Sequence, residues 1–543
     1  MGTGQGINIA STWEVVADGI GDCTALVNGD NRRSWTEFED RSARLAAAFT
    51  ELGCSAGGKV ASMLYNGNEY MEGLFASFKA RAAPVNVNYR YVEDELLYLL
   101  DNSDTDILLF HGDLAERVNA VRNRVPGLKA VVQVDDGSPH LDGALRYEDL
   151  IAAHDPAPRI DRSGDDLYIL YTGGTTGTPK GVMWRHDDVF GSLAPTVYPL
   201  AGHDIPTTSE EAGRLAAEFV DEGRVPVQIP ASPLMHGTGF FTQMIATTVG
   251  GTAVTLTERH FNPRELWETV EREGVTQVCI VGDAFGKPMV DALEAAESEG
   301  RAYDLSSLFL IISSGVMWSA PVKKALSDKA GVICIDTLGS SEGIGFGASM
   351  DAPGSEAKTA RFTIGDTTKV FTEDGREIEP GSGEKGLLAL AGAIPLGYYK
   401  DPDKTATTFP TYDGVRYSIP GDWATVEADG TINLLGRGSV SINTGGEKVY
   451  PEEVEEAVKS HPAVADAVVV GVPDEKFGQA VTAVVQLEPG AAASPEEIAD
   501  ATRGHLAGFK RPRHVVVVDA VQRGPNGKTD YAWAKEQALA RIG

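Results

Sequence analysis

Between Trp35 and Leu256 the chain alternates amphipathic stretches with short runs of β-branched and aliphatic residues. Apolar positions recur with helical spacing over Thr36–Leu52, which predicts a helix. The short runs Lys59–Leu64, Ala83–Val87 and Ile107–Phe110 predict buried strands. After a polar break, a second series of predicted strands follows at Val275–Val281, Leu308–Ile312 and Val332–Asp336. Strands that alternate with helices are typical of parallel sheets covered by helices. The break, a Glu-rich segment at Thr207–Gly223, predicts a surface helix.

The pattern changes in the last third of the chain. Lys369–Tyr398 and Val415–Leu435 contain short strand-like runs between Asp-Gly and Pro-Gly turns, which predicts an antiparallel sheet or small β-barrel. After Gly436-Arg437-Gly438 a compact α+β unit is predicted, with helices and strands at Pro451–Ser460, Ala465–Val472, Gln479–Leu487, Pro495–Leu506 and His514–Val518. We therefore expect an α/β protein with a large N-terminal domain (residues 1–437) of two βα sheets plus a small β-barrel. A hinge (438–440) and a small mobile α+β C-terminal domain (441–543) follow.

Composition narrows the class of protein. The chain has 543 residues, 42% of them hydrophobic and 23% charged, which suits a soluble globular protein of more than one domain. We expect it to be cytoplasmic, because no apolar run reaches the roughly 20 residues that span a bilayer and the start lacks a signal-peptide pattern. The four cysteines lack the spacing of a zinc or redox motif. A net charge of −31 disfavours nucleic acid as a partner.

A glycine- and threonine-rich loop follows the strand-like run Leu167–Tyr171. It reads Thr172-Gly173-Gly174-Thr175-Thr176-Gly177-Thr178-Pro179-Lys180-Gly181. Glycines let backbone N–H groups approach an anion closely, hydroxyls add donors, and lysine supplies charge. Pro179 stands where a Walker A loop needs glycine. The loop therefore indicates a phosphate site of another kind.

This loop resembles the signature loop of the adenylate-forming superfamily, which includes acyl-CoA synthetases, peptide-synthetase adenylation domains and luciferases. The resemblance covers nearly the whole chain, because further motifs follow in the family's order. It implies a C-terminal domain that rotates between two half-reactions, and ATP, Mg²⁺ and coenzyme A as the small molecules used. It also implies that the phosphates of ATP are bound by Thr172, Gly173, Gly174, Thr175, Thr176, Gly177 and Lys180.

Two further motifs concern the acyl carboxylate and the nucleotide. Pro233-Leu234-Met235-His236-Gly237 is similar to the family motif in which the histidine lies beside the carboxylate. Asp336-Thr337-Leu338-Gly339-Ser340-Ser341-Glu342 resembles the motif ending Tyr-Gly-x-Thr-Glu, which implies that Glu342 holds Mg²⁺ and Ser341 contacts the α-phosphate. Adenine contacts are implied for Ser314, Gly315, Val316, Asp336, Leu338 and Gly339. Leu338 departs from the family's usual aromatic residue, so adenine packing there would be aliphatic.

The remaining motifs lie around the predicted hinge. Tyr417–Trp423 resembles the motif whose aspartate, here Asp422, binds the ribose, and Gly436-Arg437 matches a motif whose arginine reaches the ribose or phosphate. Ser439 occupies the hinge position. Gly445, Gly446 and Lys448 belong to a segment similar to the loop that faces coenzyme A, and Pro525–Asp530 resembles the catalytic-lysine motif. The resemblance thus implies Lys528, His236, Glu342 and Thr172 as the catalytic set, with Lys528 used in adenylation alone.

The acyl pocket is expected in Gly237–Phe241, Val281–Gly286 and Gly343–Gly347. The candidate lining residues are His236, Gly237, Phe240, Phe241, Asp283, Ala284, Gly343 and Gly345. Because these segments are mainly glycine, threonine and apolar residues, they predict a bulky apolar acid. Segments such as Val85–Tyr91 and Asp304–Leu308 also look like actinobacterial ligases for steroid side-chain and terpenoid acids.

We therefore predict an acid–thiol ligase that converts a steroid- or terpenoid-type acid to acyl-AMP and then to acyl-CoA. A medium- or long-chain fatty acid as substrate, the loading of a carrier protein and a non-catalytic binding homologue stay open, as does a homodimer. The glycines of Gly343–Ala348 also match a dinucleotide fingerprint, which would indicate a dehydrogenase. The ordered set of motifs explains those glycines better.

Overall fold

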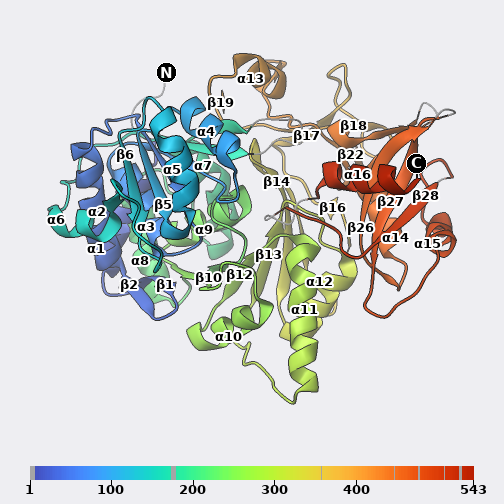
Figure 1. The fold of residues 1–543 in the computed structure, drawn as a ribbon, viewed down its shortest axis with the longest axis horizontal. Coiled ribbons are helices and arrows are strands. Elements are labelled where there is room, and N and C mark those ends of the chain that lie inside the picture. The colour runs from blue at the N-terminus through green and yellow to red at the C-terminus, as the bar shows by residue number, and fades with distance from the viewer. Residues whose placement is uncertain are drawn as a thin grey trace.

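The computed structural model describes residues 6–172, 179–355, 358–444, 447–474, 477–506, 508–524 and 529–542. Figure 1 shows two sheets with their helices in the blue-to-yellow part of the chain and a smaller orange-to-red part beside them. Within the described residues, no helix is long and apolar enough to cross a membrane. The molecule therefore has the α/β architecture with a small C-terminal part that the sequence predicts.

The first large sheet has eight strands in the order β19-β9-β8-β4-β3-β5-β6-β7. They are β3 (Lys59–Met63), β4 (Ala83–Asn86), β5 (Ile107–His111), β6 (Ala130–Val134), β7 (Leu145–Arg146), β8 (Leu167–Thr172), β9 (Lys180–Arg185) and β19 (Gly397–Tyr398). The pairs from β8 to β7 are parallel, whereas β9 and β19 add antiparallel strands at one edge. The carboxyl ends of the parallel strands therefore meet along one side of the sheet. The predicted strands at β3, β4 and β5 are confirmed.

The helices of this half are α2 (Trp35–Glu51), α3 (Asn68–Lys79), α4 (Glu93–Asn102), α5 (Ala115–Val121), α6 (Tyr147–Ala153) and α7 (His186–Leu193). The predicted helix at Thr36–Leu52 is confirmed as α2. It begins after Ser34, whose hydroxyl accepts from the Glu37 N–H while the Glu37 carboxylate accepts from the Ser34 N–H. This reciprocal capping satisfies two backbone donors that a helix start otherwise leaves unpaired.

The second large sheet also has eight strands, in the order β15-β14-β13-β12-β10-β11-β1-β2. They are β1 (Thr24–Asn28), β2 (Asn31–Ser34), β10 (Val227–Pro230), β11 (Thr252–Thr255), β12 (Gln277–Ile280), β13 (Leu310–Ser314), β14 (Ile333–Ser340) and β15 (Gly343–Asp351). Its helices are α1 (Ile9–Ile20), α8 (Ser209–Asp221), α9 (Gly237–Thr248), α10 (Pro263–Glu273), α11 (Gly282–Ser298) and α12 (Ala320–Ala330). The strands predicted at β12, β13 and β14 and the helix predicted at α8 are confirmed.

Helix α9 lies between the two large sheets. It packs on β10, β11 and β12 of the second sheet. Toward the first sheet, the Phe240 ring stacks on the Tyr168 ring of β8 with centroids 4.0 Å apart, and Phe241 meets Trp184 of β9 edge-on at 5.6 Å. A helix that is apolar on more than one face suits such a buried position. The start of α9 is thereby held where both sheets end.

A five-stranded antiparallel sheet follows in the order β16-β23-β22-β18-β17. It consists of β16 (Arg361–Phe362), β17 (Thr368–Phe371), β18 (Lys385–Leu390), β22 (Asp422–Val426) and β23 (Ile432–Arg437). A hairpin of β20 (Thr411–Tyr412) and β21 (Val415–Arg416) and helix α13 (Pro402–Thr408) accompany it. The antiparallel prediction is confirmed; in the described residues the sheet is open, since β16 and β17 remain its two edges.

The C-terminal part has its own sheet in the order β25-β24-β27-β26, with β28 parallel to β27. Its strands are β24 (Ile442–Thr444), β25 (Glu447–Val449), β26 (Val464–Asp474), β27 (Gly478–Leu487) and β28 (His514–Val518), and its helices are α14 (Pro451–Lys459), α15 (Pro495–Ala501) and α16 (Tyr531–Ile542). Valines and alanines of β26 and β27 form its core with α14 and α16. The predicted elements of this unit are confirmed.

Candidate active site

The motif residues gather where the parallel strands of both large sheets end. Thr172 ends β8, His236 follows β10 and caps α9, and Ser314 ends β13. All three line one large cavity. Ligands of open α/β sheets bind at this side of the strands, because the loops there converge.

The ends of the phosphate loop are described, and its middle is not. Thr172 on β8 pairs in register with Lys180 on β9, so the hairpin brings the two loop ends together. The Lys180 ammonium pairs with the Asp401 carboxylate and lies 6.0 Å from the centroid of the Tyr398 ring. That hydrogen bond holds the pKa of Asp401 below its usual value. The predicted residues Gly173, Gly174, Thr175, Thr176 and Gly177 lie outside the described residues.

The buried side chain of Asn86 connects the β8–β9 hairpin, called here the phosphate hairpin, to the segment that ends at His236. The Asn86 side chain donates to the Tyr171 carbonyl at 2.8 Å and the Met235 carbonyl at 2.6 Å, and accepts from the Tyr171 N–H at 2.6 Å. Asn86 is 4% exposed, so three hydrogen bonds satisfy most of a desolvated amide. His236 follows Met235 directly. Asn86 therefore fixes the distance between Thr172 and His236, a role that the sequence analysis missed.

Glu342 is held by a tyrosine from a distant strand. The Tyr398 hydroxyl donates to Glu342 Oε1 at 2.8 Å. The Trp184 indole donates to the Ser341 carbonyl at 3.0 Å, which anchors the preceding residue. Tyr398 and Trp184 were not among the predicted site residues. Because Tyr398 lies on β19 and Lys180 lies beside its ring, the tyrosine links the phosphate hairpin to the predicted metal ligand.

The residues around Glu342 fit a magnesium site in which the protein supplies one carboxylate and substrate phosphates supply most of the other ligands. In the part of the chain that the structure describes, no group of three His, Cys, Asp or Glu side chains is arranged to hold a metal. Mg²⁺ is commonly held by one or two carboxylates, with substrate phosphates and water completing the shell. Glu342 is partly exposed and uses Oε1 for Tyr398. Its second oxygen suits that single-carboxylate arrangement.

The predicted adenine segment forms a hydrogen-bonded strand end. Ser314 Oγ donates to the Thr337 carbonyl at 2.8 Å, and Thr337 Oγ1 donates to the Ser313 carbonyl at 3.0 Å. Gly315 follows with φ +91°, a conformation that side-chain-bearing residues rarely adopt. Ser314, Gly315, Gly339 and Ser341 line the large cavity, whereas Val316 lines a second one.

Asp336 and Leu338 lie on β14, beside this segment. Asp336 is 5% exposed, and burial raises its pKa to about 7. The nearby Lys323 ammonium opposes this shift, while the carboxylates of Asp283 and Asp351 add to it. Leu338 is partly exposed and pairs in register with Gly347 of β15. Both the protonated and the ionised form of Asp336 are therefore available near neutral pH.

The two predicted ribose residues meet across a strand pair. Asp422 begins β22 and Arg437 ends β23, and they are direct register partners. The 3₁₀ turn Gly438–Val440 follows at once. The structure describes the backbone of Arg437, Ser439 and Lys448, and their side chains lie outside the described atoms. The predicted residues Gly445, Gly446 and Lys528 lie outside the described residues.

The large cavity has a volume of about 1200 Å³. From Thr172, His236 and Ser341 it extends between α9 and the second sheet. Its wall there is mainly apolar: Phe241, Ile245, Ala246, Val249, Leu310, Ile312 and Ile335. The far end reaches the surface, because Leu200 (82% exposed) and Phe309 (53% exposed) also line it. Gly524 and Thr529, which flank the predicted lysine turn, line the cavity too.

The predicted acyl-pocket residues divide into two groups. His236, Gly237, Phe241 and Gly345 line the large cavity. The other four need correction. Phe240 is buried against Tyr168, and Gly343 is a packing position where a Cβ would lie 2.7 Å from the Phe346 ring.

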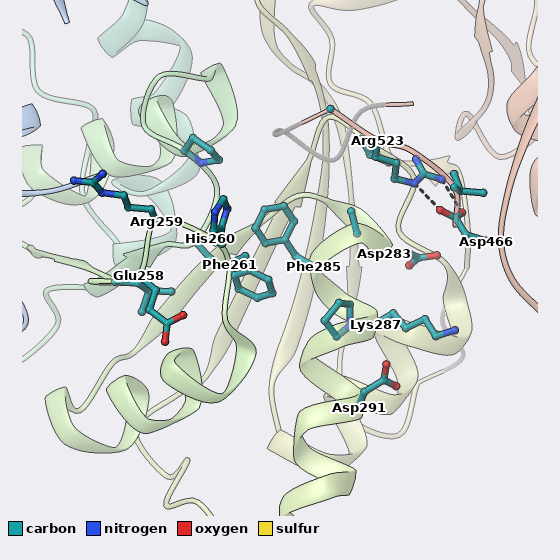
Figure 2. Close-up of a pocket in the computed structure, with 18 of the residues that line it drawn as sticks. Glu258, Arg259, His260, Phe261, Asp283, Phe285, Lys287, Asp291, Asp466 and Arg523 are labelled. Atoms are coloured by element: carbon teal, nitrogen blue, oxygen red, sulfur yellow. Dashed lines mark hydrogen bonds and ion pairs between the residues drawn. The ribbon is translucent and has the colours of Figure 1, made fainter. Parts of the chain in front are cut away.

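Asp283 and Ala284 line the second cavity, of about 630 Å³, between α11 and the C-terminal part. The Asp283 carboxylate accepts from the Ser319 N–H at 2.9 Å and hydroxyl at 3.1 Å. Figure 2 shows Asp283, Lys287 and Asp291 on one wall, and Asp466 hydrogen-bonded to Arg523 on the C-terminal side. Lys287 pairs with Glu488 across the gap. Gly282, which precedes Asp283, has a φ of +51°.

Comparison with known proteins identifies the class. Residues 13–399 match the family of AMP-binding enzymes, and residues 453–528 match the AMP-binding enzyme C-terminal domain. The chain belongs to the AMP-binding enzyme family.

Individual relatives cover almost the whole chain. It is 44% identical over 544 residues to a 3-oxocholest-4-en-26-oate–CoA ligase of Rhodococcus rhodochrous, covering 98% of this chain and 96% of the relative. It is 43% identical over 548 residues to a medium/long-chain-fatty-acid–CoA/3-oxocholest-4-en-26-oate–CoA ligase of Mycobacterium tuberculosis (strain ATCC 25618 / H37Rv), covering 98% and 97%. The anthranilate CoA ligase AuaEII in complex with anthranoyl-AMP has the same fold, with a TM-score of 0.84 at 21% identity over 99% of this chain and 98% of that one.

Proposed function

We propose that the protein is an AMP-forming acyl-CoA ligase for bulky apolar acids. The observation that carries the proposal is the large cavity, which joins the phosphate hairpin at Thr172 to an apolar wall around Phe241 and Ile335. ATP and a hydrophobic acid would meet beside His236, at the start of α9. The names of the two relatives support a steroid acid, and one of them also supports fatty acids.

The proposed reaction follows from charge. The acid's carboxylate attacks the α-phosphorus of ATP, acyl-AMP forms and pyrophosphate leaves. N–H and hydroxyl donors of the Thr172 loop, together with Lys528, would stabilise the negative charge that builds on the phosphate oxygens. His236 would orient the carboxylate, and the sulfur of coenzyme A then attacks the acyl carbon and releases AMP. No covalent enzyme intermediate is needed.

Magnesium would be held by Glu342, which Tyr398 orients, and by phosphate oxygens. When bound it neutralises phosphate charge and so favours attack by an anion. Asp422 and Arg437 would hold the ribose, which fits their cross-strand pairing. Leu338 would pack on the adenine, and Asp336 would face its exocyclic amine.

The domain assignment remains part of the proposal. Residues 1–437 would form the adenylating domain, 438–440 the hinge and 441–543 the rotating domain. Gly524 and Thr529 line the large cavity. Their position supports a role for Lys528 in the adenylation of the acid when the C-terminal part is placed as in this structure. Ser439 lies in the 3₁₀ turn and would absorb the rotation. Coenzyme A would then contact Gly445, Gly446 and Lys448.

We also propose a cytoplasmic location and a homodimer, the latter to be checked by the mass of the purified protein in solution.

An acid panel tests the proposal. Purified protein is incubated with ATP, Mg²⁺, coenzyme A and a single acid from acetate, hexanoate, hexadecanoate and a steroid side-chain acid, and AMP and acyl-CoA are measured. We expect both products in equal amounts, with kcat/KM highest for large apolar acids. Omitting coenzyme A should leave pyrophosphate exchange intact. Absence of AMP with every acid would overturn the ligase, and acyl transfer to a phosphopantetheinyl carrier protein alone would favour a loading enzyme.

The second candidate substrate class is the medium- and long-chain fatty acids. The apolar rim at Leu200 and Phe309 favours it, because a flexible chain can leave the cavity there. The same panel separates the two classes through the ratio of kcat/KM for hexadecanoate and for the steroid acid.

A further inference from the structure

Three glutamine side chains form a hydrogen-bonded chain in the wall of the large cavity. Gln277 Nε2 donates to Gln228 Oε1 at 2.8 Å, and Gln228 Nε2 donates to Gln243 Oε1 at 3.0 Å. Gln243 Nε2 donates to Thr247 Oγ1 at 3.1 Å and ends the chain. Gln228 on β10 and Gln277 on β12 are direct register partners, and Gln243 and Thr247 are one turn apart on α9. This chain of glutamine hydrogen bonds therefore joins strands β12 and β10 to helix α9 in the cavity wall.

Gln277 is the end of this chain that faces the cavity. Gln228 and Gln277 both line the cavity, but Gln228 and Gln243 are 0% and 1% exposed, whereas Gln277 is partly exposed. An amide side chain offers two N–H donors and an oxygen with two acceptor positions. Gln277 uses one N–H, on Gln228, and among the described residues it makes no other side-chain hydrogen bond. One donor and one acceptor atom thus remain for a bound molecule.

Nearby polar groups of the wall are already used. The Thr242 hydroxyl donates to the Thr238 carbonyl at 2.8 Å, and the Thr276 hydroxyl donates to the Val227 carbonyl at 3.3 Å. Arg224, which also lines the cavity, pairs with Glu222 at 2.7 Å and donates to the Ala201 carbonyl at 3.0 Å. Leu310 and Ile335, along the same stretch, are apolar. An alkyl chain that displaced water here would leave the second N–H and the oxygen of the Gln277 amide unpaired, which is unfavourable for a buried polar group. An oxygen atom on the acid would avoid that cost.

The position along the sheet sets where that oxygen must be. Gln277 pairs in register with Leu310, four residues before Ser314 at the nucleotide end of β13. At about 3.3 Å per residue the separation along the strand is on the order of 13 Å. A rigid ring system can hold an oxygen at such a distance from its carboxylate, and an unsubstituted fatty acid has none to offer.

We infer that Gln277 is a specificity-determining residue that hydrogen-bonds a carbonyl or hydroxyl oxygen far from the carboxylate of a polycyclic acid. The inference rests on the proposed function and deepens it: the preferred substrates are oxygenated polycyclic acids. Because the Thr247 hydroxyl can donate as well as accept, the glutamine chain can reverse direction without losing a bond. Gln277 therefore suits a ketone and an alcohol alike.

The test uses 3-oxocholest-4-en-26-oic acid, its analogue cholest-4-en-26-oic acid without the ketone, and hexadecanoic acid. Binding of each is measured by calorimetry in the presence of an ATP analogue with an α,β-methylene bridge, and AMP release with coenzyme A is measured separately with ATP. The variants are Gln277→Met, which keeps the side-chain length but removes the polar atoms, and Leu310→Met as the matched control at the same depth. Both substitutions introduce methionine, which has a volume similar to that of the residue it replaces, and a protein core tolerates such exchanges.

We expect the natural chain to bind the 3-oxo acid about tenfold or more tightly than its analogue, since a site built for a hydrogen bond rejects a ligand lacking it. Gln277→Met should reduce this ratio to about one while hexadecanoic acid binds as well or better, and Leu310→Met should keep the ratio. A preference absent from the natural chain, kept in Gln277→Met, or lost equally in Leu310→Met overturns the inference. Selective binding without AMP release would support Gln277 and overturn the ligase.

Discussion

The Tyr398 hydroxyl donates a hydrogen bond to Glu342 Oε1 at 2.8 Å, although the two residues lie 56 positions apart. Tyr398 also places its ring 6.0 Å from the Lys180 ammonium. One side chain therefore relates the predicted metal ligand to the only described lysine of the phosphate loop. This arrangement leads directly to the first prediction.

Tyr398→Phe should weaken magnesium activation. The variant removes a hydrogen bond to a charged group, which is worth about 1.5–3 kcal/mol, so Glu342 loses its orientation. We expect the Mg²⁺ concentration for half-maximal adenylation to rise by about tenfold or more, with the KM for the acid little changed. Pyrophosphate exchange over a magnesium titration measures this. Tyr412→Phe, in the hairpin of β20 and β21, serves as control, and equal magnesium constants in all three proteins would contradict the role of Tyr398.

Lys528→Ala should abolish most of the first half-reaction and spare the second. A lysine that supports only the adenylation transition state contributes about 2.7–4 kcal/mol, by analogy with a single preorganised donor. We expect pyrophosphate exchange to fall by about 100- to 1000-fold, while a supplied acyl-adenylate is converted to acyl-CoA at nearly the normal rate. Lys535→Ala, an exposed lysine on α16, is the matched control. A comparable loss in both half-reactions would refute the division of labour.

Asp336→Asn should change how stability depends on pH. Burial raises the pKa of Asp336 to about 7 in the folded protein, from about 3.9 in an unfolded chain. The folded state therefore binds this proton more tightly, and the stability present below about pH 4 is lost as the pH rises toward about 7. The loss amounts to roughly 4 kcal/mol above that range.

The asparagine variant does not titrate, so its melting temperature should fall less than that of the natural chain between about pH 5 and pH 8. Comparing slopes with pH removes any constant cost of the new amide. Asp221→Asn, on the exposed end of α8, should behave like the natural chain. Parallel melting curves for Asp336→Asn and the natural chain would show that Asp336 does not titrate in this window.

Ile335→Trp should shorten the usable cavity. Ile335 lies on β14 in the apolar wall, and each methylene that can no longer be buried costs about 0.8 kcal/mol. We expect kcat/KM for hexadecanoate to fall about tenfold or more, with hexanoate changed by less than about twofold. Val517→Trp on β28 adds the same ring on the surface of the C-terminal sheet. If hexadecanoate and hexanoate lost activity in proportion, Ile335 would not limit the acyl site.

Sequence patterns predicted the strands and the helices well, because β-branched runs and helical spacing are local signals. These patterns did not predict which residues from different strands contact one another. Asn86 contacts Tyr171 and Met235, which lie 85 and 149 positions away, and no local period encodes such a contact. Phe240 and Phe241 look alike in the sequence, and only the rotation of α9 between two sheets decides which ring meets the cavity.

Asp283 illustrates a different limit. The segment Val281–Gly286 was expected to line the acyl pocket, but Asp283 follows a glycine with positive φ and its carboxylate accepts from the Ser319 N–H. A glycine in a sequence indicates that such a conformation is possible without showing that it is adopted. Conversely, the cross-strand meeting of Asp422 and Arg437 follows from two motifs on neighbouring strands of a meander.

Leu200 and Phe309 line the far end of the cavity while much of each side chain remains in contact with solvent. A ligand site closed at its base works as a ruler, because a molecule one carbon too long collides with the base. Leu200 and Phe309 place the end of this cavity at the molecular surface instead. An acid bound as proposed would be measured between His236 and this rim, and we expect extra length beyond the rim to have little effect on kcat/KM.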